Sequence, residues 1–256
     1  MKNVQENLTN LTSLWSTVGK SFNTFTDRDN LQSSYIKNAQ WPNRVWTHKK
    51  VTLQDVVLIQ QRMQENPLSV FSYFKTSQNS EVVLTQHGFS LKSVQYGMSL
   101  PLQQTYQTTK NLRVVTVSNE SEAQLWSAAF EKAFGYYISP EIIVKTQNLI
   151  PYALVYEANQ LIGTFILYIT HHTAGIHSLG ILPEMRKKGY ATEIMLYVLN
   201  LAQQLKAELV TLQASEMAKN IYLKLGFSLD FMMENYELST HKKQTEKQTN
   251  YLFFSF

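Results

Sequence analysis

The segment Arg186-Lys187-Lys188-Gly189-Tyr190-Ala191 lies between an apolar run, residues 176–182, and a strongly periodic helical segment that begins near Ala191. This order predicts a strand, a tight basic turn and the start of a helix. The first backbone N–H groups of a helix have no partner within it and lie at the positive end of the helix dipole. Because an anion placed there satisfies these groups, the segment predicts a phosphate-binding turn. Gly189 lets the backbone approach a ligand closely, and three basic side chains add positive charge.

Two further stretches give this turn a context. Upstream, Leu179-Gly180-Ile181-Leu182-Pro183-Glu184 ends the apolar run at a proline, and downstream Asn220-Ile221-Tyr222-Leu223-Lys224-Leu225-Gly226-Phe227 predicts a helix that ends in Gly-Phe. In this order the stretches resemble the signatures of the GNAT superfamily of acyl-CoA N-acyltransferases. The family's pyrophosphate-binding pattern is Arg or Gln, two residues, Gly, one residue, and Gly or Ala. Here Arg186, Gly189 and Ala191 fill it.

The order of elements after residue 105 agrees with the mixed sheet that this resemblance implies. Strands are predicted first and a strand-helix-strand crossover later, which gives an α/β (α+β) fold with a mixed, mostly antiparallel central sheet flanked by helices. We expect a helix capped by Ser121 and a short helix after Ser139-Pro140-Glu141. The predicted strands are 112–117, 152–156, 161–170, 175–182, 209–212 and 231–238, and the later helices are 191–205 and 216–225.

The first half of the chain repeats part of this pattern. Gly88-Phe89-Ser90-Leu91 and Gly226-Phe227-Ser228-Leu229 are identical and 138 positions apart. At the same offset, the helical pattern of residues 53–63 falls on the helix that follows the basic turn. We therefore predict two GNAT-like units, an incomplete and degenerate one over 1–105 and an acetyl-CoA-binding one over 106–256.

The counterpart of the basic turn in the first unit is His48-Lys49-Lys50-Val51-Thr52, where Val51 replaces the glycine. A β-branched residue resists both the tight turn and the close approach of a ligand, so we expect no coenzyme binding there. Just before it, Trp41-Pro42-Asn43-Arg44-Val45-Trp46 is an unusual cluster. It fits a core-packing strand with two large aromatic residues better than a substrate site.

Composition and charge narrow the function classes. The chain has 256 residues, no cysteine and a formal net charge of +4, with no apolar run of the ~20 residues that a membrane span needs. Without cysteine there is no disulfide and no thiol nucleophile, and Met1-Lys2-Asn3-Val4-Gln5-Glu6 does not resemble a secretory leader, so we expect a cytoplasmic protein. The basic surplus is spread thinly, which disfavours nucleic acid as a partner. His171-His172 lacks further ligands nearby, so no metal site is predicted.

The resemblance implies the transfer of an acyl group, most often acetyl, from coenzyme A to a primary amine. The attacking amine must be neutral, and the departing thiolate needs a proton. Tyr222 matches the tyrosine that supplies this proton in many family members, although the same position could simply pack on the sheet. His177 is the candidate base, because its reference pKa suits the task. Strict alternation places His177, Leu179 and Ile181 on one face of their strand, and the sequence does not decide whether that face lines a cleft or lies under a helix.

The coenzyme contacts follow from the same resemblance, with acetyl-CoA as the expected donor. Backbone N–H groups of Leu179 and Ile181 and the side chain of Asn220 would hold the pantetheine arm, and Thr192 would reach a phosphate. The full set of expected coenzyme contacts is Leu179, Ile181, Arg186, Lys187, Lys188, Gly189, Tyr190, Ala191, Thr192 and Asn220.

The sequence thus predicts an N-acetyltransferase that acts on a primary amine of a small molecule or peptide. The alternative is a non-catalytic sensor or scaffold that binds acyl-CoA. The apolar end Tyr251-Leu252-Phe253-Phe254-Ser255-Phe256 would either add a strand to the sheet, which we favour, or contact a partner subunit in a homodimer. The identity of the acceptor cannot be deduced, because substrate contacts in this superfamily come from variable loops.

Overall fold

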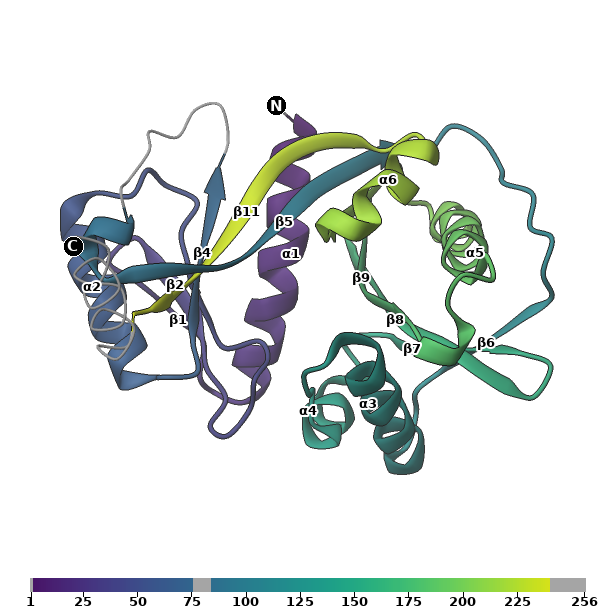
Figure 1. Cartoon of the computed structure of the whole chain (residues 1–256), viewed down its shortest axis with the longest axis horizontal. Coiled ribbons are helices and arrows are strands. Elements are labelled where there is room, and N and C mark those ends of the chain that lie inside the picture. Colours follow the sequence, from purple (N-terminus) through teal and green to yellow (C-terminus); the bar gives the residue numbers. More distant parts are fainter. Residues whose placement is uncertain (1, 76–83, 240–256) are drawn as a thin grey trace, which may run out of the picture.

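The computed structural model describes residues 2–75 and 84–239, and within these residues eleven strands form one continuous sheet. The strand order is β1-β2-β3-β4-β11-β5-β10-β9-β8-β7-β6. Figure 1 shows two lobes, the first with β1 to β4 and α2 and the second with β6 to β10 and α3 to α6, joined by the long strands β5 and β11. The predicted apolar strand at 251–256 lies outside the described residues.

The helices and strands have the following bounds. The first half contains α1 (Lys2–Ser21), β1 (Thr26–Arg28), β2 (Leu31–Ser34), β3 (Arg44–Trp46), α2 (Leu53–Glu65), β4 (Val70–Lys75), the 3-10 turn η1 (Leu84–His87) and β5 (Phe89–Pro101). The second half contains β6 (Leu112–Thr116), α3 (Glu120–Phe134), α4 (Pro140–Thr146), β7 (Tyr152–Glu157), β8 (Gln160–Thr170), β9 (Thr173–Ile181), η2 (Pro183–Met185), α5 (Tyr190–Gln204), β10 (Leu209–Ala214), α6 (Glu216–Lys224) and β11 (Ser228–Leu238).

The fold is a mixed α+β fold with a mostly antiparallel open sheet flanked by helices, as the sequence predicts. Two pairs in the described sheet are parallel, β9 with β10 and β3 with β4. The expected short helix is α4, and it begins at Pro140 with Ser139 as its cap, two residues earlier than predicted. The predicted cap of α3 was wrong by two residues: the side chain of Asn119, and not Ser121, accepts the hydrogen bond from Glu122 N.

The two long strands are exchanged between the halves of the chain. β5 belongs to the first half, yet it pairs with β10 on one side and β11 on the other. β11 ends the described chain and pairs antiparallel with β4 of the first lobe. Because the sheet runs without a break across residue 105, the predicted division into 1–105 and 106–256 stays a prediction.

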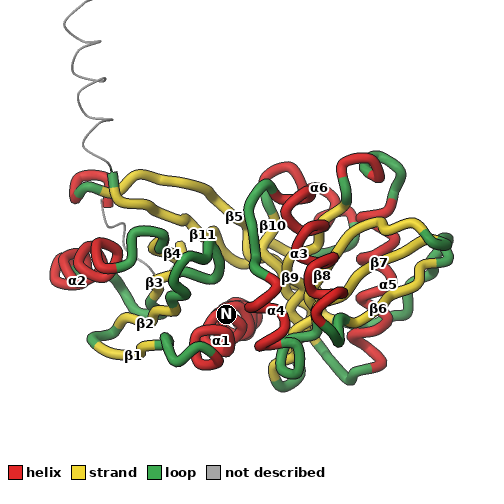
Figure 2. The backbone as a smooth tube through the Cα atoms, turned by 90° about the horizontal axis from the view of Figure 1, so that it is seen from below, coloured by secondary structure: helices red, strands yellow, loops and turns green. Residues whose placement is uncertain are grey.

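Helix α1 lies between the two lobes, as the views in Figure 1 and Figure 2 agree. Its apolar stripe, which includes Leu11, Trp15 and Val18, is buried in a core shared with α3 and α4. Helix α5 packs on the opposite face of the second lobe in a separate core. Gly175 of β9 makes the contact with α1 possible, since a Cβ there would lie 1.7 Å from Asn10 Oδ1. This helix was not predicted from the sequence.

Candidate functional site

The basic turn forms an open helix N-terminus. Gly189 precedes α5 with φ 82°, and Lys187 has φ 61°. Residues in this left-handed region turn successive N–H groups toward one concave side, which suits an anion. No side chain of the described residues caps this end of α5. A Cβ on Gly189 would meet no described atom within 4 Å, so the turn needs the glycine for its positive φ and not for lack of space.

The strands β9 and β10 separate next to this turn. They pair in parallel from Thr173↔Leu209 to Ile176↔Leu212. Beyond Ile176, β9 carries one extra residue relative to β8, because the register moves from His177↔Ile166 to Gly180↔Thr164. Ser178, within this bulge, has φ 53°. A bulge bends its strand and interrupts the ladder, and here it accompanies the opening between β9 and β10.

A cavity of about 370 Å³ lies where the basic turn, β9, the end of α3 and α6 meet. It brings together most of the predicted site: Leu179, Ile181, Arg186, Lys187, Gly189, Tyr190, Ala191, Thr192 and Tyr222 all line it. Lys188 and Asn220 are not among the lining residues of the described chain. Lys188 Nζ lies 3.8 Å from Met185 Sδ, and Asn220 is exposed on α6.

The wall of the cavity that α3 contributes was not predicted from the sequence. Ala133 and Phe134 line the cavity, and both lie against β9, since a Cβ on Gly180 would come within 2.8 Å of Ala133 Cβ and 2.5 Å of Phe134 Cε2. The one signal in the sequence was Phe134 next to Gly135, an aromatic residue at the end of an amphipathic helix. Gly135 has φ 76° and ends α3 there.

Arg186 donates hydrogen bonds to two backbone carbonyl groups of the protein, and it also adds positive charge to the site. Its Nε donates to Ile181 O at 3.2 Å and its Nη2 donates to Ala133 O at 2.8 Å. The guanidinium therefore ties the basic turn to both the end of β9 and the end of α3. This fixes the geometry of the cavity and leaves a positive charge beside it.

Tyr222 projects from α6 into the cavity and is partly buried, with its ring 5.8 Å from that of Phe227. Burial raises the pKa of Tyr222 to about 12. The phenol therefore stays protonated at neutral pH and can donate a hydrogen bond. Helix α6 contacts the first half of the chain, because Lys219 Nζ on α6 lies 4.0 Å from the ring centroid of Tyr96 on β5.

His177 lies under α1, one of the two arrangements that the sequence left open. Its Nε2 is 3.0 Å from Asn10 Oδ1, and burial lowers its pKa to about 4, so it is neutral at pH 7. The expectation of strict alternation was wrong, because the bulge puts His177 and Gly180 on one face and Leu179 and Ile181 on the other. His177 is not among the described residues that line the cavity. Its role as base stays a prediction.

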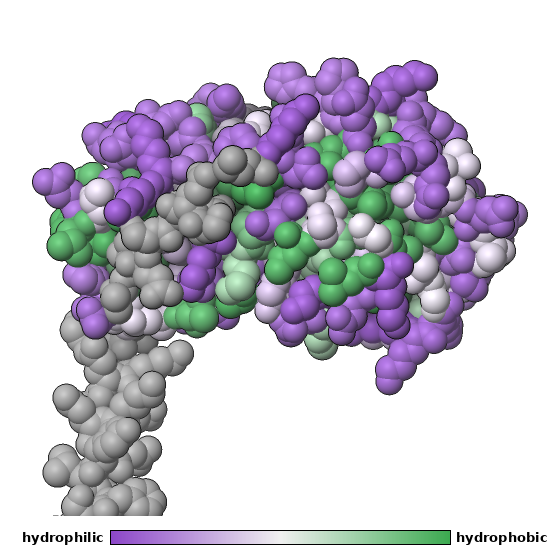
Figure 3. All heavy atoms as spheres, turned by 90° about the horizontal axis from the view of Figure 1, so that it is seen from above, coloured by the Kyte–Doolittle hydropathy of each residue, from purple (hydrophilic) through white to green (hydrophobic). Residues whose placement is uncertain are grey.

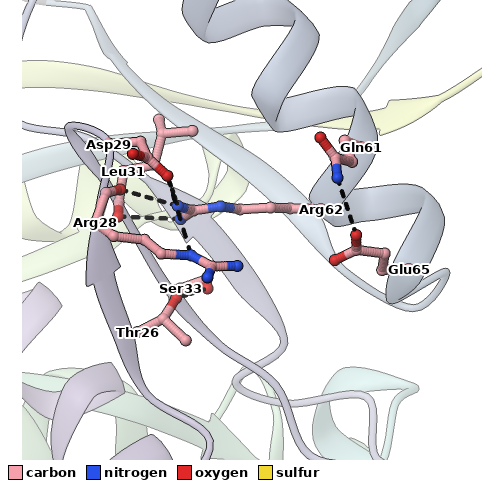
Figure 4. A network of polar contacts seen from close by, with 8 residues as sticks. All are labelled: Thr26, Arg28, Asp29, Leu31, Ser33, Gln61, Arg62 and Glu65. Carbon is pink, nitrogen blue, oxygen red and sulfur yellow. Dashed lines mark hydrogen bonds and ion pairs between the residues drawn. The ribbon is translucent and has the colours of Figure 1, made fainter.

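The corresponding helix of the first lobe begins in a different way. Thr52 caps α2, and Asp55 completes a capping box: Asp55 Oδ2 accepts from Thr52 N at 2.8 Å, and Asp55 N donates to Thr52 Oγ1. Val51 is buried. At the other end of α2, Arg62 donates to Leu31 O and Arg28 O and fastens the helix to β1 and β2 (Figure 4).

The described residues offer no group of three or more His, Cys, Asp or Glu that could hold a metal ion. Over the same part of the chain, none of the helices is both apolar enough and long enough to span a membrane. On the face shown in Figure 3, hydrophobic side chains lie among hydrophilic ones over the second lobe. Met217 and Leu223 of α6 and Leu229 of β11 are exposed hydrophobic residues.

Comparison with known proteins identifies the class. Residues 117–227, which hold the basic turn and the whole lining of the cavity, match the model of the acetyltransferase (GNAT) family. These residues therefore form an acetyltransferase (GNAT) family domain, and the protein is an enzyme of the acyltransferase class. No curated protein sequence matches it.

Solved structures share the fold over both lobes. A GCN5-related N-acetyltransferase from Kribbella flavida is 13% identical, with a TM-score of 0.65 over 89% of this chain and 96% of that one. A functionally unknown conserved protein from Staphylococcus epidermidis is 16% identical, with a TM-score of 0.61 over 84% and 93%. A GCN5-related N-acetyltransferase from Sphaerobacter thermophilus is 15% identical, with a TM-score of 0.56 over 82% and 79%. At these identities the likeness concerns the fold alone.

Proposed function

We propose that the protein transfers an acetyl group from acetyl-CoA to a primary amine of a small molecule or peptide. The observation that carries the proposal is the N-terminus of α5, which no side chain of residues 2–75 or 84–239 caps and which opens on the same cavity as Tyr222. An anion site and a protonated phenol are what a phosphate-bearing thioester donor requires from the protein. The cavity also has the size of an ordinary ligand pocket, which is roughly 300 to 1,000 Å³.

The residues that line the cavity fit successive parts of the coenzyme, from its pyrophosphate to its pantetheine arm. The N–H groups at the start of α5, with the charges of Lys187 and Arg186, suit the pyrophosphate. The backbone of Leu179 and Ile181, next to the opening between β9 and β10, suits the pantetheine arm. Apolar atoms of Phe134 and Ile221 line the remaining wall.

The reaction needs two proton movements. The amine nitrogen forms a bond to the thioester carbon, the C–S bond breaks, the new ammonium loses a proton and the thiolate gains one. Tyr222 supports the second step, because its raised pKa keeps a proton available. The cavity-lining residues of the described chain include no carboxylate and no histidine, so we assign the removal of the amine proton to water.

The test is turnover with acetyl-CoA and a panel of primary amines, comparing the wild type with Tyr222→Phe. We expect the variant to lose about 100-fold or more in kcat with unchanged acetyl-CoA affinity by calorimetry, since the substitution removes only the hydroxyl and the phenyl ring keeps the packing on Phe227. Binding of acetyl-CoA without acetylation of any amine would instead favour the sensor or scaffold alternative.

A further inference from the structure

The hydroxyl of Tyr190, at the start of α5, is bound by the protein itself. Tyr190 is the first residue of this helix and lines the cavity, and only 6% of it is exposed. Its hydroxyl donates a hydrogen bond to Glu157 Oε2, at the end of β7. A phenol has one proton to donate, so this hydroxyl does not donate to a ligand. Tyr190 therefore forms part of the cavity wall and at the same time connects the start of α5 with β7.

The segment that joins β5 to β6 also contacts the first turn of α5. Lys110 Nζ lies 4.7 Å from the centroid of the Tyr190 ring. Glu193, a buried residue of the first turn, accepts three hydrogen bonds, from Thr109 N at 2.9 Å, from Thr109 Oγ1 at 2.6 Å and from Lys110 N at 3.2 Å. The start of α5 is thus fastened to two separate elements, the end of β7 and the segment before β6.

These contacts matter because the N-terminus of α5 has no capping side chain among the described residues. Gly189, its N-cap, has no side chain of its own. Helix ends fray, and an anion site made of backbone N–H groups binds well only when those groups keep their direction before the ligand arrives. A capping side chain would occupy the N–H groups, whereas the contacts of Tyr190 and Glu193 hold the turn and leave these groups to a ligand.

We infer that Glu157 is a positioning residue for the coenzyme and acts through Tyr190. Its carboxylate fixes the phenol, the phenol fixes the first turn of α5, and this turn presents its N–H groups to the pyrophosphate. The inference rests on the proposed function and adds to it a residue that is not among the described residues lining the cavity. Loss of the hydrogen bond should weaken coenzyme binding, although neither the hydroxyl nor the carboxylate contacts the coenzyme.

The first experiment compares two tyrosine–glutamate pairs by titration calorimetry with acetyl-CoA. Tyr190→Phe removes the hydroxyl and keeps the ring, and we expect the dissociation constant to rise about 10-fold, as for the loss of a hydrogen bond to a charged group. Tyr236→Phe is the matched control, because Tyr236 is also buried and its hydroxyl donates to Glu234 Oε2 at 2.7 Å in the first lobe. Both variants lose the same kind of contact, so a merely structural role would change acetyl-CoA affinity in neither. Equal affinities of the two variants would overturn the inference.

Variants of Glu157 test whether it acts through Tyr190. Glu157→Gln keeps an oxygen that accepts from the hydroxyl, so its affinity for acetyl-CoA should stay within about 3-fold of the wild type. Glu157→Ala leaves the hydroxyl without this acceptor and should weaken binding as much as Tyr190→Phe does. The double variant should bind no more weakly than either single variant, because both changes remove the same interaction. Additive losses would show that the two residues act independently and would overturn the inference.

A donor without phosphates separates an effect on the anion site from a general loss of structure. Acetylpantetheine carries the same thioester as acetyl-CoA and lacks the pyrophosphate. Tyr190→Phe should therefore lower kcat/KM for acetyl-CoA about 10-fold, mainly through KM, and lower kcat/KM for acetylpantetheine much less. Equal reductions for the two donors would contradict a role in positioning the anion site.

Failure of the proposed function has a different signature. The calorimetric comparison needs no acceptor amine, so a lower affinity in Tyr190→Phe than in Tyr236→Phe without any turnover would support the role of Glu157 and refute acetyl transfer. Turnover together with equal affinities would refute the role of Glu157 alone. If acetyl-CoA does not bind to the wild-type protein, both are refuted. If Glu157→Ala fails to fold, Tyr190→Phe and Glu157→Gln still decide.

Discussion

Two parts of this molecule have the same topology and opposite local chemistry. In the second lobe, β9, α5 and β10 form a parallel strand-helix-strand unit, and in the first lobe β3, α2 and β4 form another. Helix α5 begins at Gly189 with its first N–H groups uncapped by any described side chain, whereas α2 begins with the Thr52 and Asp55 capping box. The first unit supplies its own carboxylate where the second leaves room for an anion.

The strand pairs of the two units also differ, because one pair is complete and the other is interrupted. Each residue of β3, from Arg44 to Trp46, has a partner on β4, so this pair stays closed. β9 pairs with β10 only as far as Ile176 and then passes into the bulge at Ser178. A ligand site therefore does not follow from the topology alone. It needs an uncapped helix end and an interrupted strand pair together.

The largest expected effect comes from filling the open end of α5. Gly189→Glu places a negative charge at the anion site and forces a side chain into a φ of 82°. We expect acetyl-CoA affinity to fall by more than about 100-fold, or ~3 kcal/mol, in titration calorimetry. Gly88→Glu is the control, because Gly88 has a similar φ of 78° in the first lobe. An unchanged affinity in Gly189→Glu would refute the assigned site.

A second prediction concerns the histidine next to the open strands. The folded pKa of His177 is about 4 against an ordinary 6.5, so between these values the unfolded chain binds more protons. The stability that the neutral, buried ring contributes is complete above about pH 6.5 and is lost as the pH falls toward 4. His177→Gln should remove about 3 kcal/mol of this pH dependence from the free energy of unfolding, measured in urea at several pH values. Parallel curves for the two proteins would contradict the burial of this ring under α1.

The smallest effect is expected from removing the capping box at the start of α2. Asp55→Ala removes one half of the capping box and should destabilise the fold by about 1 kcal/mol. Acetyl-CoA should still bind at one site per chain, because the buried Val51 keeps the turn before α2 without a glycine. A second binding site in calorimetry would show that the capping box alone separates the two units.

Local patterns in the sequence were enough to predict the second lobe. The order of elements from residue 112 to 238 and the turn at Gly189 depend on residues close together in the chain, whereas Tyr222 was assigned to the site through the resemblance to the GNAT family. The bulge at Ser178 was not predicted, since nothing in an apolar strand marks where an extra residue breaks its alternation. This single residue explains why His177 faces α1 and not the side that Leu179 occupies.

Longer-range features could not be deduced. The helix over the first 21 residues was not predicted, because the polar residues Asn7 and Asn10 lie on its buried face and interrupt its apolar pattern. Their side chains donate hydrogen bonds to backbone carbonyl groups of strands far away in sequence. Arg44 stood in a stretch that the sequence marked as unusual, and Trp41 and Trp46 are indeed buried in the core. Its surroundings come from α1, β4 and β11 together, and no pattern of neighbouring residues in the sequence reveals these contacts.

The pairing of β5 with β10 and β11, two strands from the second half of the chain, also determines when the sheet can form during synthesis. β5 leaves the ribosome early, and both of its neighbours, β10 and β11, are synthesised only near the end of the described chain. Until then its two edges are unpaired, and such edges pair readily with other chains. The sheet can close only when synthesis has passed residue 238, so folding of the second lobe depends on strands from both halves of the described chain. Neither half of the described chain can therefore complete its strand pairing without the other.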